Sequence, residues 1–356
     1  MPRFSPVELK RLGVAIFEHL GASHEDAELV VDTLIDANLV GHDSHGIHYI
    51  TRYAERIRKG IIVPTSEPEV TNESPSTAII DGHWTFGQAT AKKTVEVAIE
   101  KARKSSISAV GAFHCNHVGR LGAYTMIAAQ NNMIGFLMAN SSHLTVQAYG
   151  GASRVLGTNP LSVAIPASET KPFLLDFATS AVAEGKIWLA AMKGEKVPLG
   201  WIVDKDGNDT DNPADFSVPG TIEGGRLRTF GARDGHKGYC LSILIEILGG
   251  ILTGAGSIID TENVHPNENG LLAIVMDIKK FKSIEAFKKG IDSLVATVHE
   301  EPVDPRSQFS HVQIPGEFEW RNREKNLRDG IEVPSVVWEQ IVSLARELRI
   351  DIKNPR

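Results

Sequence analysis

Three histidines at steps of three residues, His42, His45 and His48, lie beside an aspartate and a serine at the junction of two helix-like stretches. Imidazole titrates near neutral pH, so these side chains are suited to proton transfer. We interpret His42 and His48 as surface or capping residues. His45 is the active candidate, because the adjacent Gly46 would let a substrate or cofactor approach the backbone closely.

A second polar segment, residues 114–122, follows a predicted strand and enters a predicted helix, a position where backbone N–H groups bind anions. His117 is its acid–base candidate, and Arg120 is a candidate clamp for a carboxylate. A polar loop with one hydrogen-bonded histidine explains the same residues about equally well. The pair His114 and His117 beside Cys115 also permits zinc, but no further ligand set at suitable spacing accompanies it.

Other polar loops could also contact a ligand. Residues 231–239 carry Lys237 in a glycine-rich loop before an apolar helix. Backbone N–H groups at such a helix start, together with the lysine, could bind a phosphate group. The chain contains neither Walker A spacing nor G-x-G-x-x-G, so a nucleotide site would be neither a P-loop nor a Rossmann fingerprint. Shorter polar segments, each typical of a turn when taken alone, lie near predicted strand ends or helix starts at 140–142, 157–160, 176–180 and 314–317.

Periodicity predicts the elements that must position these residues. Residues 1–60 predict three helices joined by tight turns, and charged helices return from about residue 316. Short apolar runs between them, bounded by Gly, Pro and Asn, predict strands that alternate with helices. We therefore expect an α/β fold, with a helical domain of residues 1–72 together with 317–356 and an α/β body of residues 73–316. The predicted strands are a short strand and turn around 76–82, then 107–112, 133–139, 161–166, 173–177 and 271–277. The predicted helices of the body are 88–104, 121–131, 181–193, 237–252 and 283–299.

Composition narrows the function classes. Of the 356 residues, 42% are hydrophobic and 23% are charged, and the formal net charge is −7. This acidic balance, without a long basic run, disfavours nucleic acid and anionic membranes as partners. No apolar stretch reaches membrane-spanning length, and the N-terminus shows no signal peptide. Two cysteines cannot form a disulfide framework, so we expect a cytoplasmic enzyme or small-molecule binder.

Six short motifs, taken together and in order, resemble the malate/L-lactate/ureidoglycolate dehydrogenase family, whose members bind nicotinamide cofactors without a Rossmann fold. Each motif alone is weakly specific, but six in the same order argue against a chance match. They span residues 43 to 317, so the resemblance covers nearly the whole chain. The motifs are Asp43-Ser44-His45-Gly46, Asn116-His117-Val118-Gly119, Gly157-Thr158-Asn159-Pro160-Leu161, Leu175-Asp176-Phe177-Ala178-Thr179-Ser180, Gly235-His236-Lys237-Gly238-Tyr239 and Pro315-Gly316-Glu317.

The resemblance implies reversible hydride transfer between NAD(P)H and a small 2-oxo acid, which gives a 2-hydroxy acid of the lactate, malate or aryl-lactate type. It implies NAD or NADP as cofactor, with NAD slightly favoured, a homodimer, and a mostly antiparallel sheet in the body that holds cofactor and substrate. In some members the histidine that matches His45 is the proton donor, and in others it is the one that matches His117. We keep both, and we favour His117 because Arg120 follows it by about one helical turn.

The resemblance also implies the further residues of the site. The substrate-binding candidates are Ser44, Tyr49, Arg52, Arg120, Thr158 and Asn159. The cofactor-binding candidates are His45, Gly119, Arg120, Leu121, Ser141, Asp176, Phe177, Ala178, Thr179, Ser180, His236, Lys237, Gly238, Pro315, Gly316 and Glu317. No residue is assigned to a metal.

One position departs from the family pattern. Many members read S-H-G-x-x-R, in which the arginine can bind the substrate carboxylate, whereas this chain has Tyr49 there. Loss of a charge-assisted bidentate contact would cost roughly 1.5–3 kcal/mol. We expect Arg120, and secondarily Arg52, to supply the replacement cation. Tyr49 also makes the pocket more apolar, which would favour aryl or alkyl 2-oxo acids over malate.

Two other function classes stay open at the level of sequence. A zinc-dependent hydrolase could use His42, His45, His114 and His117, and it would lose activity when treated with a chelator. A non-catalytic dinucleotide-binding protein would bind NADH without turnover. The ordered motifs favour the dehydrogenase over both.

Overall fold

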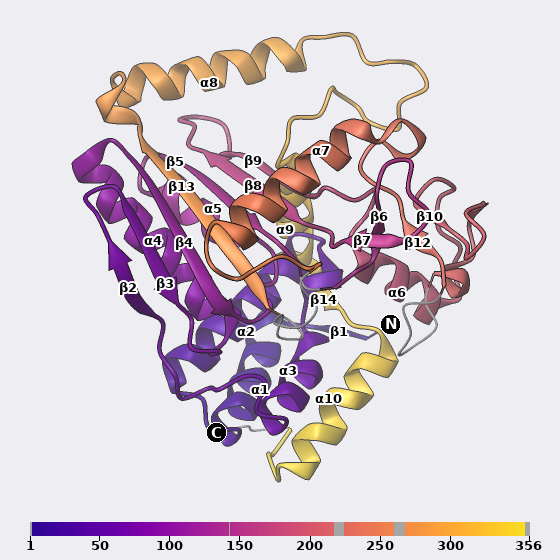
Figure 1. Cartoon of the computed structure of the whole chain (residues 1–356). Coiled ribbons are helices and arrows are strands. Elements are labelled where there is room, and N and C mark those ends of the chain that lie inside the picture. The colour runs from indigo at the N-terminus through magenta and orange to yellow at the C-terminus, as the bar shows by residue number, and fades with distance from the viewer. Residues whose placement is uncertain (1, 142, 217–223, 260–267, 353–356) are drawn as a thin grey trace.

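The computed structural model describes residues 2–141, 143–216, 224–259 and 268–352, and within these ranges it has a mixed α/β fold built around a seven-stranded sheet (Figure 1). The mixed α/β class predicted from the sequence is thereby confirmed. Neighbouring strands are antiparallel, apart from β3 and β4, which run parallel. In spatial order the strands are β2 (Glu69–Glu73), β3 (Thr77–Asp81), β4 (Ile107–Cys115), β13 (Asn269–Asp277), β5 (Met133–Ala139), β8 (Pro160–Ile165) and β9 (Phe173–Ala178).

Helices cover both faces of this sheet. Helices α4 (Gly87–Ser105) and α5 (Gly122–Gln130) pack on one face, where buried alanines allow the helices to approach the strands closely. Helix α7 (His236–Ile245) and the π-helical turn η4 (Glu246–Ile251) cover the other face. Adjacent residues of β5 serve opposite faces, as the alternation of a strand requires: Leu137 faces α4 and α5, and Met138 faces α7.

The N- and C-terminal segments share one hydrophobic core. This core unites α1 (Pro6–His19), α2 (His24–Leu39), α3 (Tyr49–Arg58) and α10 (Ser335–Glu347). Strands β1 (Arg3–Phe4) and β14 (Ile331–Glu332) pair antiparallel, and α9 (Glu317–Asp329) contacts α2. Ser5 and Glu8 form the capping box that opens α1. The division into two domains stays a prediction, and residues 353–356 of its C-terminal segment lie outside the described ranges.

A smaller sheet lies beside the main one, next to α6 (Glu184–Lys193) (Figure 1). Its two- and three-residue strands are too short to produce a periodic signal, so sequence reasoning did not find them. Helix α8 (Ile284–His299) runs along one end of the main sheet (Figure 1). Within the described residues, no helix is long and apolar enough to span a bilayer. The strands of the smaller sheet are β11 (Asp209–Thr210), β10 (Ile202–Val203), β12 (Arg226–Leu227), β6 (Val146–Gln147) and β7 (Arg154–Leu156), and the short 3₁₀ turns of the chain are η1 (Asp43–His45), η2 (Pro213–Asp215), η3 (Ala232–Asp234) and η5 (Ile278–Lys280).

Candidate active site

A cavity of about 500 Å³ is bordered by η1, the first turns of α3, the β4–α5 connection, the end of β9 and the start of α6. His45 and His117 both line it. Their imidazole rings are nearly parallel, with an interplanar angle of 11° and centroids 5.8 Å apart. The two histidines that the sequence singled out therefore share one cavity, although they come from distant segments of the chain.

Asn38, near the end of α2, holds the turn that carries His45. Its Nδ2 donates to Oδ1 of Asp43 at 2.6 Å, and its Oδ1 accepts from the backbone N–H of Ile47 at 2.9 Å. A side chain at Gly46 would bring its Cβ within 2.2 Å of Asn38 Oδ1. Gly46 is therefore required here for space, because the buried amide of Asn38 occupies the volume beside it.

The loop that carries His117 is fixed by the buried side chain of Asn116. Its Nδ2 donates to the carbonyl oxygens of Trp84 and Thr85 at 2.8 and 3.0 Å. A Cβ on Gly87, the first residue of α4, would lie 2.1 Å from the carbonyl oxygen of Asn116. The Asn-His pair of the sequence motif thus combines a positioning residue with a cavity residue.

Tyr53 and Tyr49, on α3, orient the imidazole of His117. The Tyr53 hydroxyl lies 2.7 Å from His117 Nδ1, and it accepts a hydrogen bond from Gln88 Nε2 at 2.9 Å. The Tyr49 ring stacks on that imidazole at a centroid distance of 4.4 Å and an angle of 12°. Because one side of the ring is stacked and Nδ1 is bonded, Nε2 is the nitrogen that remains for chemistry in the cavity.

Both imidazoles are neutral near pH 7 in this structure. Burial, and then the neighbouring charges of His42 and His48, lowers the pKa of His45 to about 3. Burial, and then His45, holds the pKa of His117 well below its ordinary value. A neutral imidazole has a free lone pair, so either ring can accept a proton from a bound hydroxyl group.

Cationic groups line the cavity on two sides. Arg52 and Arg56 lie one turn apart on α3, and the Arg52 guanidinium carbon is 5.3 Å from the centroid of the Tyr49 ring. Lys186 belongs to the first turn of α6, whose N-cap Ala183 provides no side-chain cap. The backbone N–H groups of this helix start and the three cations together favour anionic ligands.

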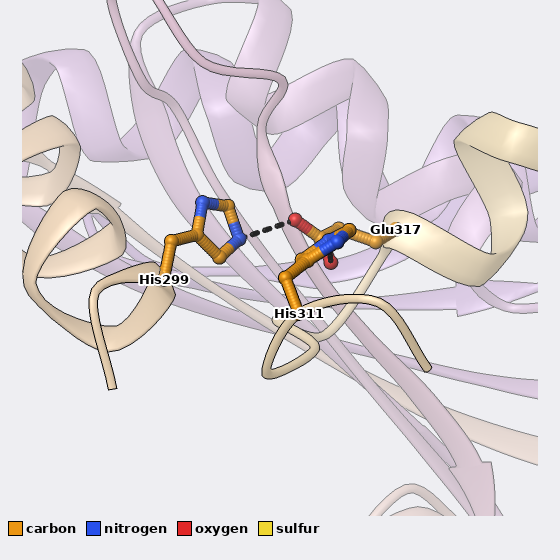
Figure 2. Close-up of side chains that lie close together, drawn as sticks. All are labelled: His299, His311 and Glu317. Carbon is orange, nitrogen blue, oxygen red and sulfur yellow. Dashed lines mark hydrogen bonds and ion pairs between the residues drawn. The ribbon is translucent and has the colours of Figure 1, made fainter. Parts of the chain in front are cut away.

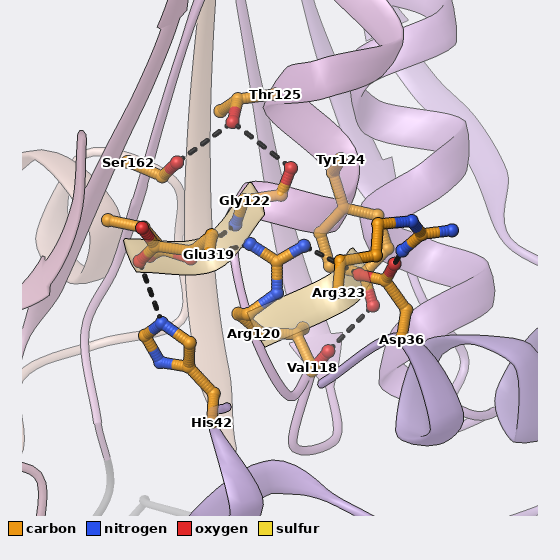
Figure 3. Close-up of polar contacts among 11 residues, drawn as sticks. Asp36, His42, Val118, Arg120, Gly122, Tyr124, Thr125, Ser162, Glu319 and Arg323 are labelled. Carbon is orange, nitrogen blue, oxygen red and sulfur yellow. Dashed lines mark hydrogen bonds and ion pairs between the residues drawn. The ribbon is translucent and has the colours of Figure 1, made fainter. Parts of the chain in front are cut away.

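Arg120 lies in the cavity wall, but its guanidinium is held by two carboxylates (Figure 3). Nη2 binds Asp36 at 2.6 Å and Nη1 binds Asp176 at 3.3 Å, while Arg323 binds the other oxygen of Asp36. Asp176 also accepts from the backbone N–H of Gly122 at 2.8 Å. The expected role of Arg120 at the substrate carboxylate stays a prediction, and this geometry argues against it, because two carboxylates already bind its guanidinium.

Three of the four histidines of the hydrolase alternative, His42, His45 and His117, line the cavity, but the four form no common ligand cluster among the described residues. His42 Nε2 binds Glu319 at 2.9 Å, and His114 Nδ1 binds Asp81 at 3.0 Å. Within the described ranges, none of these four histidines belongs to a group of three metal-ligating side chains. His48 lines a different cavity, between α3, α6 and α10, and it is the N-cap residue of α3, without a side-chain cap hydrogen bond.

The remaining predicted residues divide into two sets. Besides the two histidines, those in the cavity wall are Ser44, Tyr49, Arg52, Gly119, Arg120, Leu121, Ser141, Thr158, Asp176, Phe177, Ala178 and Ser180. Those outside the wall are Asn159, Thr179, His236, Lys237, Gly238, Pro315, Gly316 and Glu317.

Two of the outlying residues are engaged elsewhere. Asn159 is fully buried, and its Nδ2 donates to the Ser242 carbonyl oxygen and to Glu246, each at 3.0 Å. Glu317 binds two histidines that lie outside this cavity. The substrate role of Asn159 and the cofactor role of Glu317 stay predictions, and these contacts argue against both, because the polar atoms already have protein partners.

Sequence reasoning missed several cavity residues. Arg56 could have been found, because it follows Arg52 by four residues on a predicted helix and so shares its face. Trp188, Trp201 and Phe230 come from segments without a motif, and only the packing of the smaller sheet brings them to the cavity.

The chain is similar over its whole length to known dehydrogenases. A family model described as malate/L-lactate dehydrogenase matches residues 4–342. A malate/(S)-sulfolactate dehydrogenase from Methanothermus fervidus is 38% identical, with 98% of each chain covered. Hydroxycarboxylate dehydrogenase B from Escherichia coli is 33% identical, with 97% of this chain and 94% of that protein covered. The crystal structure of malate dehydrogenase from Entamoeba histolytica superposes with a TM-score of 0.93 at 29% identity, covering 98% of this chain and 99% of that one.

Proposed function

This chain belongs to the malate/L-lactate dehydrogenase family, and from that premise we propose that it interconverts a small 2-hydroxy acid and its 2-oxo acid with a nicotinamide dinucleotide. The family resemblance inferred from the six motifs is thereby confirmed. The observation that carries the proposal is the nearly parallel pair His45 and His117 in a cavity bordered by cations. The hydrolase alternative is disfavoured, because His42 and His114 bind carboxylates and none of its four histidines belongs to a group of three metal-ligating side chains among the described residues.

The cavity residues fit a nicotinamide dinucleotide. Phe177, Phe230, Trp188 and Trp201 offer apolar aromatic surface for a flat ring, and Lys186 at the start of α6 offers positive charge for a diphosphate. When bound, the dinucleotide supplies the hydride chemistry. We propose that it is held by Gly119, Leu121, Ser141, Phe177, Ala178 and Ser180, with NAD slightly favoured over NADP. Contacts from Thr179, from His236–Gly238 and from Pro315 and Gly316 stay predictions from the family resemblance.

We assign proton transfer to His117. In the oxidation direction the neutral Nε2 accepts the proton of the substrate hydroxyl, and in the reduction direction the imidazolium returns it. His45 lies beside His117 in the same cavity, with ring centroids 5.8 Å apart, and Ser44 Oγ is 3.0 Å from its Nδ1. His45 therefore serves to position the substrate oxygen by a second hydrogen bond.

We assign the substrate carboxylate to Arg52 and place Arg56 beside it. Several relatives act, by their names, on malate or sulfolactate, which carry two anionic groups. The cations Arg52, Arg56 and Lys186 support a preference for such dianions. The expected preference for aryl or alkyl 2-oxo acids assumed that the Tyr49 ring contacts the substrate. The ring instead stacks on the imidazole of His117, which argues against that preference.

A substrate panel tests the proposal. Pyruvate, oxaloacetate, phenylpyruvate, 2-oxoglutarate and a cyclic imino acid are assayed with NADH and with NADPH by the loss of dinucleotide absorbance. We expect turnover, with the highest kcat/KM for oxaloacetate. A higher value for phenylpyruvate would overturn the substrate preference alone. NADH binding without turnover of any compound would instead favour the non-catalytic binding protein.

The family resemblance also leads us to propose a homodimer. Leu244, Ile247, Ile251 and Leu252, on α7 and the turns that follow it, are 46, 46, 56 and 60% exposed, which supports an interface there. Light scattering at a known protein concentration would distinguish a dimer from a monomer.

A further inference from the structure

His299, His311 and Glu317 form a cluster outside the cavity already described (Figure 2). His299 Nε2 lies 2.6 Å from Glu317 Oε1, and His311 Nε2 lies 3.1 Å from Glu317 Oε2. The two imidazole rings are nearly perpendicular, at 83°, with centroids 5.0 Å apart. We propose that this cluster binds a divalent transition-metal cation, with Zn²⁺ as the representative ion.

The ligand atoms suit such a cation. Imidazole nitrogen and carboxylate oxygen bind Zn²⁺ at about 2.0–2.2 Å, which places neighbouring ligands of a tetrahedral site roughly 3.3 Å apart. One ligand atom from each of the three side chains lies within 4.8 Å of the others. Small side-chain rotations would therefore close the site. Three protein ligands would leave the fourth position for water.

Neighbouring groups orient two of the three ligands. Ser310 Oγ is 3.2 Å from His311 Nδ1, so a proton on Nδ1 can be donated to the hydroxyl while the Nε2 lone pair faces the cluster. The backbone N–H of Ile314 donates to Glu317 Oε2 at 3.2 Å. Gln313 Nε2 donates to the His311 carbonyl oxygen at 3.0 Å and fixes the loop between them.

Solvent can reach the cluster. The side chains of His299, His311 and Glu317 are 33, 42 and 24% exposed, so a hydrated cation could enter without unfolding. None of the three lines the cavity that holds His45 and His117. The metal would therefore have a structural role, and its loss would leave the proposed chemistry in place.

The cluster joins three separate parts of the chain. His299 ends α8, Glu317 begins α9, and His311 belongs to the connection between them. A bound cation would cross-link these parts and stabilise the folded state, since the unfolded chain lacks the assembled site. The same connection reaches the main sheet, because the Leu174 backbone N–H donates to the Pro315 carbonyl oxygen at 3.2 Å. We expect the thermal unfolding midpoint to rise by a few degrees when the site fills.

The test titrates the EDTA-treated and dialysed full-length protein with Co²⁺, and follows the visible ligand-field absorption of the bound ion. The wild type should bind one Co²⁺ per chain, and Zn²⁺ should displace it. Glu317→Gln and the double variant His299→Asn, His311→Asn should weaken Co²⁺ binding by at least about 100-fold, because each loses a direct ligand. Circular dichroism checks folding, and the single variant His311→Asn serves if either of these fails to fold.

The matched control is His24→Asn. His24 is 69% exposed and pairs with two carboxylates, Glu18 at 2.7 Å and Glu28 at 3.8 Å, but among the described residues it belongs to no group of three side chains that could hold a metal. The control should keep wild-type Co²⁺ affinity. Absence of Co²⁺ binding by the wild type would overturn the proposal, as would equal affinity in the wild type and Glu317→Gln. Loss of binding in His24→Asn would place the ion elsewhere.

Discussion

The phenolic oxygen of Tyr53 lies 2.7 Å from Nδ1 of His117 and 3.3 Å from the carbonyl oxygen of the same residue. A hydroxyl group can both donate and accept. Because Nε2 holds the lone pair that accepts the proton, Nδ1 of His117 carries a hydrogen in both protonation states, and the Tyr53 oxygen accepts from it while its O–H donates to the carbonyl oxygen. Tyr53 is thus placed to hold the imidazole in one orientation through both halves of a proton-transfer cycle.

Replacing Tyr53 by Phe should lower kcat about tenfold with little change in KM, because the ring of His117 loses a hydrogen bond in both protonation states. Steady-state kinetics with the preferred 2-oxo acid measures the effect. Tyr124→Phe is the matched control, since it removes another buried hydroxyl, which binds the Val118 carbonyl oxygen at 2.6 Å. Equal losses of kcat in both variants would show that Tyr53 acts only through stability.

Replacing Arg52 by Ala should raise KM for a dianionic 2-oxo acid by about 10–100-fold, the equivalent of one charge-assisted contact of roughly 1.5–3 kcal/mol. The unfolding midpoint should change little, because Arg52 is exposed. Arg120→Ala should instead destabilise the fold by about 3–5 kcal/mol, because it leaves the buried carboxylate of Asp176 without its Arg120 partner, whereas Asp36 keeps Arg323. An unchanged KM in Arg52→Ala would refute its assignment as the carboxylate ligand.

The pH dependence of kcat/KM should differ between the two directions, because this parameter reports the protonation state of the free enzyme. Oxidation needs a neutral imidazole, and burial lowers the pKa of His45 to about 3 and that of His117 well below its ordinary value. The imidazole contribution to oxidation should therefore not change between neutral and alkaline pH. Reduction needs the imidazolium, whose fraction falls about tenfold for each pH unit above the pKa. A plateau in reduction that extends to neutral pH would mean that the donor titrates near its ordinary pKa.

Gly46→Ala should cost about 1–3 kcal/mol of stability through overpacking, because its Cβ would lie 2.2 Å from Asn38 Oδ1. It should also lower kcat/KM by up to about 10²-fold, because the clash would displace the adjacent His45. Chemical denaturation and steady-state kinetics measure the two effects. Gly290→Ala on α8 is the control, because its Cβ would meet nothing within 4 Å, and it should be neutral or slightly stabilising.

Elements with long periodic or apolar runs were predictable from the sequence. The predicted strand 133–139 is β5, with the same bounds, and the helix predicted over 283–299 is α8, which begins one residue later. The helix predicted over 237–252 is instead α7 followed by a π-helical turn. There Glu246 is buried and accepts hydrogen bonds from the Ile258 backbone and from Asn159. Such long-range partners leave no periodic signal, so the π-helical turn could not be predicted.

The sequence indicated which residues line the candidate site, but it indicated only partly which groups those residues bind. His45 and His117 stand next to glycine or asparagine in short motifs, and both line the cavity. Arg120 carries the same kind of signal, yet Asp36, far away in the sequence, binds its guanidinium. Whether a cation faces a ligand or an internal carboxylate depends on tertiary packing, which spacing along the chain does not encode.

The most direct test of the account compares wild type with His117→Asn, in the reduction of the preferred 2-oxo acid by NADH. Dinucleotide fluorescence first establishes that both proteins bind NADH equally. We predict that the variant loses about 10²–10⁴-fold in kcat, because the group that transfers the proton is gone. A variant that binds NADH and reduces the acid at the wild-type rate would contradict it.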